Sequence, residues 1–281
     1  MRTFELIAVL GLLVPGTALA VSPDSTDARA IMNAVESQAE LDKLKSRIVI
    51  SIADKAGRKR VRAVRSMSMV FEGGTRQLML FESPADVRNT GLLSVDYDDG
   101  AKNDDQWLYL PSLYKSTRIS SGEKSGSFMG TDLSYSDMTK ADPAHFDYAV
   151  VKQAVKAQGE DCWLIESKPN TEKAKHETGY LKSRIWISKS KLLPIQVKAW
   201  IREGRKLKYI TFGDLKQLGG VWVPHKITAR TVQNKEVQSR TVIQITEQTV
   251  NNADVVEGQF TQRRLEAGRR ILVLTPQGET L

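Results

Sequence analysis

Residues 193–248 of the chain read LPIQVKAWIREGRKLKYITFGDLKQLGGVWVPHKITARTVQNKEVQSRTVIQITEQ. Polar and apolar residues alternate along most of this stretch, with the period of two that is typical of β-strands with one buried face. The alternating runs cover residues 193–203, 206–218, 221–232 and 236–248. The connections between them contain Gly204, Gly219-Gly220 and Asn234-Lys235. Connections this short join neighbouring antiparallel strands as hairpins, so the stretch predicts an antiparallel meander.

The same pattern continues toward the N-terminus. Ile48, Ile50 and Ile52 alternate with their neighbours, and further strand-like runs cover 161–168 and 182–189. Strands do not alternate with helices, which argues against a doubly wound or TIM-barrel architecture. We therefore predict a mainly β protein with about eleven strands, and thirteen at most.

Helical spacing occurs near the two ends of the chain. Between Asp24 and Leu41, Ile31, Met32 and Val35 fall on one stripe, with Asp24 or Ser25 as the expected N-cap. Phe260–Ala267 is a second helical candidate, and a short apolar run, Ile271–Leu274, follows it. We expect two or three helices in all.

A sheet of this many strands has to curl or close. In residues 194–202, Ile195, Val197 and Ala199 lie on one face, and Lys198 and Trp200 lie on the other. The charges therefore belong outside, and an apolar interior is left to be filled. We predict an open, curved antiparallel sheet, a half or incomplete β-barrel, in which an N-terminal helix and short helices plug a hydrophobic cavity.

The first twenty residues have the pattern of a secretory signal peptide. Arg2 precedes an apolar run from Leu6 to Val14, and Ala18-Leu19-Ala20 matches a small-residue cleavage site. The apolar run is shorter than the roughly 20 residues that span a bilayer. We predict a signal peptide over 1–20, a single domain over 21–281, and a periplasmic location.

The chain has 41 Lys and Arg against 33 Asp and Glu, a net charge of +8. Nucleic-acid binding is not expected, because aromatic residues are not interleaved with the basic runs and the protein is secreted. Charge runs of this kind are either solvated faces or docking sites for anionic headgroups or an acidic partner, with peripheral membrane contact. The docking candidates are Arg58, Lys59, Arg60, Arg202, Arg205 and Lys206.

Residues 120–138 form a Gly- and Ser-rich stretch, which we name the 120–138 loop. Gly122, Gly126 and Gly130 enclose Phe128-Met129. Apolar residues at the tip of a flexible loop need a place to be buried, and a lid that folds over an apolar cavity would provide one. The alternative is an ordinary loop whose Phe packs on its own strands.

Several motifs resemble the bacterial outer-membrane lipoprotein-sorting family, the LolA/LolB-like proteins. They are Trp107-Leu-Tyr-Leu-Pro111, Gly126-Ser-Phe-Met-Gly-Thr-Asp132-Leu-Ser-Tyr135-Ser-Asp-Met138, Leu192-Leu-Pro194 and Gly220-Val-Trp-Val-Pro224. The resemblance covers nearly all of the mature chain, in order. It implies a curved sheet whose cavity holds acyl chains. The dedicated lipoprotein carrier is shorter, so a lipoprotein, a free lipid or a lipid handed to an exporter all remain open as cargo.

The resulting hypothesis is a monomeric periplasmic carrier that passes a lipid or lipoprotein to an inner-membrane transporter or an outer-membrane acceptor. Removal of apolar surface from water would drive binding, and flexible methionines suit varied acyl chains. The cavity candidates are Ile48, Ile50, Met67, Met69, Leu78, Leu80, Trp107, Tyr109, Phe128, Met129, Ile195 and Val197. A lipid-sensing regulatory protein on the same half-barrel is the first alternative.

An envelope hydrolase is the second alternative, and the sequence gives it little support. The chain has three histidines, His145, His176 and His225, and no G-x-S-x-G motif. Asp96–Gly100 resembles a calcium loop but has Gln106 where the closing Glu would stand. Cys162, in a strand-like run, is expected to be a buried, inert thiol. We therefore expect no enzymatic activity, no cofactor and no metal.

Overall fold

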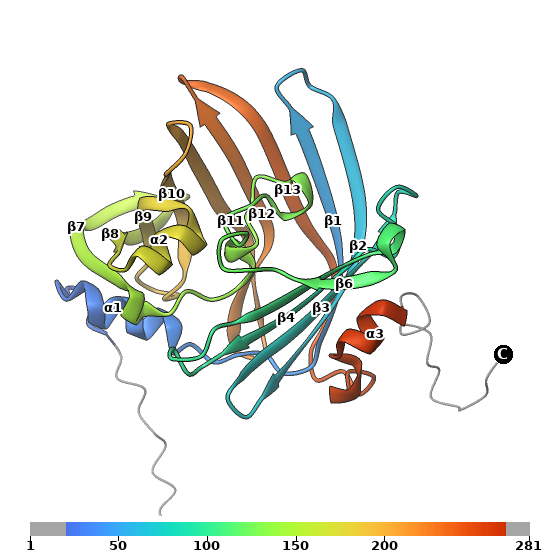
Figure 1. Ribbon diagram of the computed structural model, residues 1–281. Coiled ribbons are helices and arrows are strands. Elements are labelled where there is room, and N and C mark those ends of the chain that lie inside the picture. Colours follow the sequence, from blue (N-terminus) through green and yellow to red (C-terminus); the bar gives the residue numbers. More distant parts are fainter. Residues whose placement is uncertain (1–20, 268–281) are drawn as a thin grey trace, which may run out of the picture.

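The computed structural model describes residues 21–267 of the chain (Figure 1). The helices are α1 (Ala28–Glu36), α2 (Glu172–Thr178) and α3 (Gln262–Ala267). The first six strands are β1 (Leu44–Asp54), β2 (Lys59–Phe71), β3 (Gly74–Ser83), β4 (Gly91–Tyr97), β5 (Asp105–Leu110) and β6 (Lys115–Arg118). The others are β7 (Phe146–Ala157), β8 (Glu160–Pro169), β9 (Tyr180–Ser188), β10 (Pro194–Ile201), β11 (Lys206–Leu218), β12 (Val221–Gln233) and β13 (Glu236–Thr249). The predicted signal peptide and the run Ile271–Leu274 lie outside the described residues.

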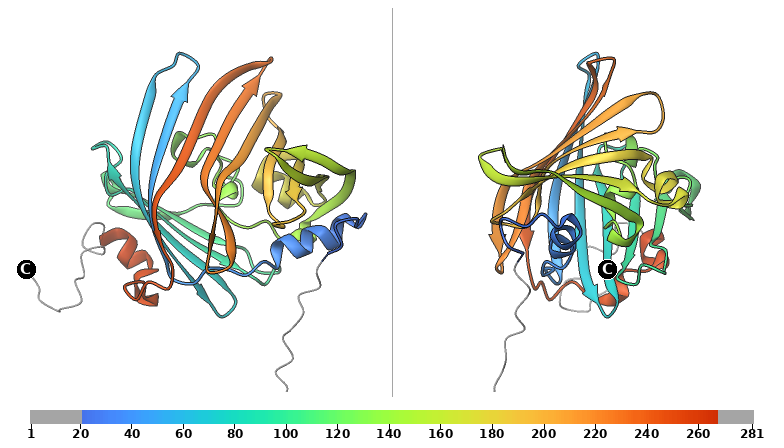
Figure 2. Two further views of the ribbon diagram at one scale, coloured as in Figure 1. Left: turned by 180° about the vertical axis from the view of Figure 1, so that it is seen from behind. Right: turned by 90° about the vertical axis from the view of Figure 1, so that its left-hand side faces the viewer.

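All of these strands belong to one antiparallel sheet with the order β6-β5-β4-β3-β2-β1-β13-β12-β11-β10-β9-β8-β7. Two meanders, β1–β6 and β7–β13, meet where β1 pairs with β13. The sheet is open, with β6 and β7 at its ends, and it curves around the segments that it encloses (Figures 1 and 2). The predicted open, curved antiparallel sheet is confirmed, with 13 strands, at the upper end of the expected number.

The hairpin between β12 and β13 shows how the sequence sets the strand pairing. Asn234 and Lys235 both have positive φ, 51° and 65°. Two successive residues with positive φ form the turn whose twist matches that of the flanking strands. This turn fixes the register in which Gln233 lies opposite Glu236.

The helix α1 packs on the inner face of the sheet, at the end formed by β7–β9. Ile31 is fully buried against Trp163, Ile165 and Ile187. The helix begins later and ends earlier than the predicted Asp24–Leu41. Asp27, and not Asp24 or Ser25, is the N-cap, because its side chain accepts a hydrogen bond from the Ala30 amide at 3.0 Å.

The segment that follows β13 crosses to the outer face of β2–β5. Leu265 in α3 is fully buried there, together with Val255 and Phe260. Gly91 in β4 allows this close approach, since a Cβ at that position would lie 2.5 Å from the Leu265 side chain. The helical candidate Phe260–Ala267 is thus confirmed in its final six residues. Among residues 21–267, no helix is long and apolar enough to cross a membrane.

Candidate functional site

The concave face of the sheet has an apolar centre. Alternate residues of β1 point inward, and Ile50 on β1 lies opposite Ile243 on β13. The next strands continue this surface, since Ile243 lies opposite Ile227 and Ile227 lies opposite Phe212. On the other side, Val64 and Phe81 lie opposite each other on β2 and β3. One apolar surface therefore extends across neighbouring strands of both meanders.

The 120–138 loop covers this surface. Phe128 at its tip is 0% exposed, and its ring centroid lies 6.0 Å from that of Phe81. Tyr135 of the same loop packs edge-on against Phe128, with 5.7 Å between centroids. Leu133 is also buried in the cluster. A loop, rather than a second sheet or a long helix, therefore fills the centre of the concave face (Figure 1).

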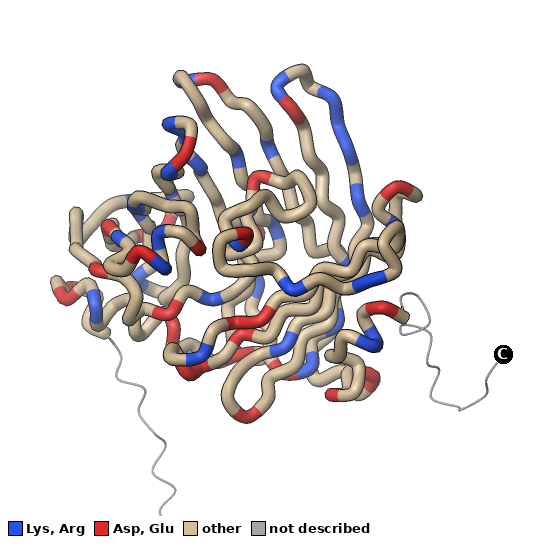
Figure 3. Tube along the Cα trace, viewed as in Figure 1, with Lys and Arg blue, Asp and Glu red and all other residues tan. Residues whose placement is uncertain are grey.

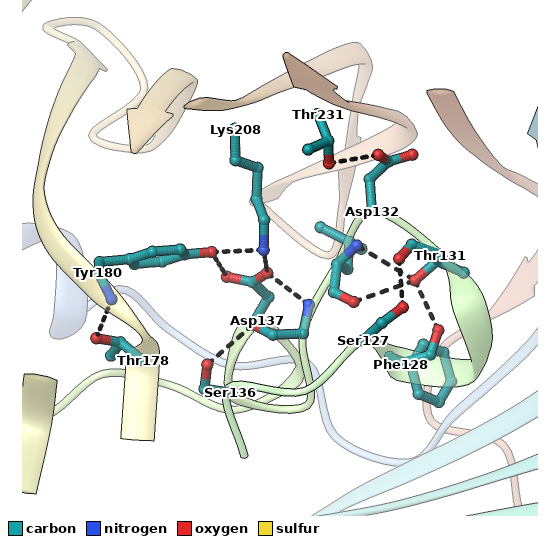
Figure 4. Close-up of polar contacts among 12 residues, drawn as sticks. Ser127, Phe128, Thr131, Asp132, Ser136, Asp137, Thr178, Tyr180, Lys208 and Thr231 are labelled. Atoms are coloured by element: carbon teal, nitrogen blue, oxygen red, sulfur yellow. Dashed lines mark hydrogen bonds and ion pairs between the residues drawn. The ribbon is translucent and has the colours of Figure 1, made fainter. Parts of the chain in front are cut away.

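The tip of the loop has a tight turn of its own. Met129 and Gly130 have positive φ, 50° and 73°. The Thr131 hydroxyl donates to the Phe128 carbonyl at 2.7 Å, and the Ser127 hydroxyl donates to the Thr131 carbonyl at 2.6 Å. These bonds hold Phe128 directed toward the sheet (Figure 4).

Asp132 attaches the loop to two strands. Its carboxylate accepts hydrogen bonds from Thr231 at 2.6 Å, from Thr241 at 2.7 Å and from Ser239. The Asp132 amide in turn donates to the Thr241 hydroxyl at 2.9 Å. Asp132 is only 5% exposed, so these hydroxyls replace the water that its carboxyl oxygens would otherwise bind.

A second carboxylate, Asp137, attaches the other end of the loop. It lies 2.7 Å from the Lys208 ammonium and 2.6 Å from the Tyr180 hydroxyl (Figure 4). Burial opposes the ionisation of Asp137. The charge and hydrogen bond of Lys208, the Ser134 amide and the Tyr180 hydroxyl outweigh this effect, so the pKa of Asp137 lies below its ordinary value. Burial and the Asp137 charge raise the pKa of Tyr180 well above its ordinary value.

A third contact holds the tip. The buried guanidinium of Arg62, on β2, donates to the Met129 carbonyl. Burial and the nearby charge of Arg60 lower the pKa of Arg62. The loop is thus fixed by apolar contacts at its tip and by polar contacts with β2, β9, β11, β12 and β13.

The predicted cavity residues fall on two opposite faces. Five of them belong to the apolar cluster on the concave face, which we name the concave cluster: Ile48, Ile50, Phe128, Met129 and Val197. A sixth, Ile195, points to the same face, because it lies two residues before Val197 on β10. The other six pack under α3 on the outer face: Met67, Met69, Leu78, Leu80, Trp107 and Tyr109. The two sets therefore do not form one surface. The strands β2–β5 are apolar on both faces, so alternation alone did not reveal which set lies inside.

The predicted docking residues lie at one end of the sheet. Arg58–Arg60 follow the end of β1, and Arg202–Lys206 connect β10 to β11. Strand pairing brings both connections to the same end, together with the β12–β13 turn. Arg58 pairs with Asp54 at 2.7 Å, and Arg202 contacts a ring nitrogen of His176 at 2.9 Å.

The residues that attach the loop were not among the predicted site residues. They are Arg62, Asp132, Asp137, Tyr180 and Lys208. The sequence does indicate that Lys208 and Arg62 point inward. Lys208 lies two residues before Ile210, and Arg62 lies two residues before Val64, and both of these apolar residues face the concave side. A lone cation on an apolar stripe predicts a buried hydrogen-bond acceptor beside it, which is the Asp137 carboxylate for Lys208 and the Met129 carbonyl for Arg62. The expectation that strand charges go outside does not hold at these two positions.

A pocket of about 440 Å³ lies at one end of the concave face, between α1, the β4–β5 connection and α2. Acidic residues dominate its charged lining (Figure 3). Burial raises the pKa of Asp96 to about 7, and burial also raises the pKa values of Glu36 and Asp104. A pocket with so many acidic side chains does not suit the hydrocarbon chains that the family resemblance implies.

The titratable residues singled out in the sequence are dispersed. His145 lies near Asp142, and His225 is buried on β12. Cys162 is buried on β8, and burial raises the pKa of its thiol to about 11, as for an inert cysteine. Within residues 21–267, no group of three His, Cys, Asp or Glu side chains could hold a metal ion.

Comparisons with known proteins agree with this architecture. Residues 73–267 match a family model whose description reads "Uncharacterized protein". No curated protein matches the chain in sequence. Among solved structures, a domain described as outer-membrane lipoprotein-sorting, from Vibrio parahaemolyticus, is 26% identical with a TM-score of 0.76. The match covers 85% of this chain and 98% of that chain.

Two further structures are similar. A DUF1329 family protein from Desulfovibrio piger is 26% identical, with a TM-score of 0.74 over 84% of this chain and 97% of that chain. A LolA superfamily protein from Nitrosomonas europaea shares the fold at 17% identity, with a TM-score of 0.62 over 84% and 98%. The chain therefore belongs to the family whose model matches residues 73–267, and its open sheet, which encloses a loop and helices, has the fold of the lipoprotein-sorting domain, the DUF1329 protein and the LolA superfamily protein.

Proposed function

We propose that the protein is a periplasmic carrier that binds the acyl chains of a lipid or lipoprotein on its concave face. The observation that carries this proposal is the position of Phe128, fully buried among inward side chains at the tip of a loop. The 120–138 loop occupies the surface that an acyl chain would occupy. Its departure would expose a continuous apolar surface across β1–β3 and β11–β13. The description of the Vibrio relative as an outer-membrane lipoprotein-sorting domain supports the same function and location.

The energetics of such an exchange are balanced. Each acyl CH₂ that leaves water contributes about 0.8 kcal/mol, whereas release of Phe128 costs roughly 2–3 kcal/mol in lost burial. Binding of the acyl chain must also compensate for the loss of the polar contacts that Asp132, Asp137 and Arg62 make in the closed loop. A long acyl chain can offset these costs, whereas a short one cannot. The loop thus acts as a lid that selects for length, with Gly122, Gly126 and Gly130 as the points where its backbone bends.

Delivery requires a partner, because a long acyl chain that is buried in the protein leaves too slowly by itself. The basic connections that contain Arg58–Arg60 and Arg202–Lys206 lie together at one end of the sheet. They are placed to contact anionic headgroups or an acidic surface on an inner-membrane transporter or an outer-membrane acceptor. The carrier acts as a monomer, without a cofactor and without catalysis.

A locked loop tests the proposal directly. The double variant Asp132→Cys/Thr241→Cys places two thiols where the carboxylate and hydroxyl now meet at 2.7 Å. Wild-type protein should bind a dansyl-labelled long-chain fatty acid, with increased dansyl fluorescence. The oxidised double variant should bind at least tenfold more weakly, and reduction should restore binding.

The single variant Asp132→Cys, under the same oxidising conditions, is the matched control. It lacks the carboxylate but cannot form the bond to β13, so it should bind the probe at least as well as wild type. Equal binding by the oxidised and reduced double variant would contradict a displaceable loop. Native mass spectrometry of protein purified from its own envelope should show a co-purifying lipid or lipoprotein, and a consistently empty protein would argue against the carrier.

A further inference from the structure

The outer face of the sheet has a row of cations at directly opposed positions of neighbouring strands. We name Lys59, Arg240, Arg230, Lys198 and Arg184 the basic row. Strand pairing links them in this order across β2, β1, β13, β12, β11, β10 and β9. Ala53 on β1 lies between Lys59 and Arg240, and Tyr209 on β11 lies between Arg230 and Lys198. Figure 3 shows basic residues on several of these neighbouring strands.

The basic row faces away from the proposed acyl site. Arg230 follows Ala229, which is buried in the concave cluster, and Arg240 precedes Thr241, which binds Asp132. Successive side chains of a strand point to opposite faces, so Arg230 and Arg240 point outward. Both are exposed. The row is therefore a surface separate from the loop and its contacts.

The row places like charges directly opposite each other, twice. Arg230 lies opposite Arg240, and Lys198 lies opposite Arg184. Such pairs destabilise a sheet. Among the described residues, Arg230, Arg240 and Lys198 form no ion pair, and the one acidic neighbour in register is Glu166 opposite Arg184. A local rule broken in this way is expected at functional positions.

Aromatic rings lie between the cations. The Lys198 ammonium is 4.7 Å from the Trp200 ring centroid, and the Arg230 guanidinium is 4.8 Å from the Tyr209 centroid. Both rings are partly exposed on the same outer face. Trp and Tyr are the side chains enriched where a protein meets the headgroup region of a membrane, because each has an apolar body and a polar tip.

We propose that the basic row binds the anionic surface of a lipid bilayer. Six strand spacings of about 4.8 Å extend the row over about 29 Å, the width of several headgroups. Cations spread over so many strands fit a plane of headgroups better than a peptide, which lies in a groove or along a sheet edge. The inference goes beyond acyl-chain binding: it assigns a membrane-facing side to the sheet, opposite the face that holds the loop.

Vesicle co-sedimentation tests the proposal. Wild-type protein should bind vesicles of phosphatidylcholine with phosphatidylglycerol, should bind pure phosphatidylcholine vesicles weakly, and should dissociate as salt is raised. The variant Lys198→Glu/Arg230→Glu/Arg240→Glu should bind the anionic vesicles at least tenfold more weakly. The variant Lys198→Gln/Arg230→Gln/Arg240→Gln removes the three charges without reversing them and should show a smaller loss of vesicle binding. It is the second test in case the Glu variant does not fold.

The matched control changes net charge equally, at exposed cations away from the row: Arg88→Glu/Lys115→Glu/Arg263→Glu. It should lose less than about threefold in vesicle binding. If this control loses as much vesicle binding as Lys198→Glu/Arg230→Glu/Arg240→Glu, the proposal is overturned, because net charge alone would then explain binding. Wild-type binding to polyglutamate without binding to anionic vesicles would also overturn it, in favour of an acidic protein partner.

The two proposals fail separately. Binding of the dansyl fatty acid in the absence of vesicles should be the same in wild type and in all three triple variants. A wild type that binds anionic vesicles but no fatty acid would refute the carrier and leave the membrane-facing surface intact. A wild type that binds fatty acid but no anionic vesicles would refute the membrane-facing surface and leave the carrier intact.

Discussion

The Lys208 ammonium lies 2.7 Å from the Asp137 carboxylate and joins β11 to the 120–138 loop across the concave face. The two side chains are only 6% and 12% exposed. Taking a pair of charges out of water costs about as much as their attraction returns, so such a pair contributes little net stability. Its effect is on position, because any other location of the loop leaves one buried charge without a partner. The pair therefore favours one closed arrangement of the loop.

Loss of one partner should free the loop. Lys208→Met keeps the length and apolar stem of the side chain but leaves Asp137 buried without its cation, at a cost of about 3 kcal/mol or more. We expect backbone amides of residues 120–138 to exchange with deuterium at least tenfold faster, while amides of β1 and β13 change less. Hydrogen–deuterium exchange with mass spectrometry measures both.

The double variant Lys208→Met/Asp137→Leu is the control for this effect. It removes both charges, so no buried ion is left unpaired, and exchange in the loop should return toward the wild-type rate. If the double variant exchanges as fast as the single one, shape and not charge balance holds the loop in place.

Acid should open the loop by the same route. The pKa of Asp137 lies below its ordinary value, so its contribution to stability is complete above about pH 4 and is lost as pH falls through the folded pKa. The protection factors of amides in residues 120–138, which correct for the pH dependence of intrinsic amide exchange, should therefore fall as the pH drops below about 4. In Asp137→Asn the loop should already exchange faster at neutral pH and show a flatter acid response, which separates Asp137 from other carboxylates.

Much of the fold could be predicted from local sequence. The alternation in residues 193–248 and the turn at Asn234-Lys235 were enough to define β10–β13, because each strand there has one apolar and one polar face. The length of α1 was overestimated, since the stripe that starts at Ile31 does not show that the Asp27 side chain caps the helix. A capping bond depends on three-dimensional geometry that side-chain periodicity does not report.

The candidate site was predictable only in part. Phe128 and Met129 were expected inside because an apolar pair in a Gly-rich loop needs burial, and both lie in the concave cluster. Leu80 was expected beside them, yet α3 covers it from outside. That outcome depends on where the chain after β13 crosses the sheet, a long-range choice that no pattern within β3 contains. Asp132 was missed because its partners, Thr231 and Thr241, are about one hundred residues away in sequence.

The acidic pocket should make the protein less stable as pH rises. Burial raises the pKa of Asp96 to about 7, so between about pH 4 and pH 7 the folded state binds more protons than the unfolded state. Stability should fall across that window and stay lower above it. Asp96→Asn removes this loss and can still accept the Lys140 amide, which lies 2.7 Å from the present carboxylate. At pH 8 it should be more stable than wild type by roughly 1–2 kcal/mol, after allowance for solvent screening.

Urea unfolding at about pH 4 and about pH 8 measures this difference, which should nearly vanish at the lower pH. Asp99→Asn, in the exposed β4–β5 connection, is the control and should change stability equally at both values. An Asp96→Asn protein that is less stable than wild type at pH 8 would mean that the carboxylate is needed in its charged form.

The two faces of the sheet give the sharpest test of where a ligand binds. Phe212 and Trp107 are both partly buried aromatics at the margins of clusters, Phe212 on the concave face and Trp107 under α3. If acyl chains replace the loop on the concave face, Phe212→Ala removes part of their contact surface. It should weaken binding of the dansyl fatty acid about fivefold or more, which corresponds to about 1 kcal/mol.

Trp107→Ala should leave the affinity unchanged, although both variants lose stability. Fluorescence titration at a temperature where both remain folded separates the effects. A loss confined to Trp107→Ala would place the ligand under α3, where a chain could enter only by displacing Leu265 and not Phe128.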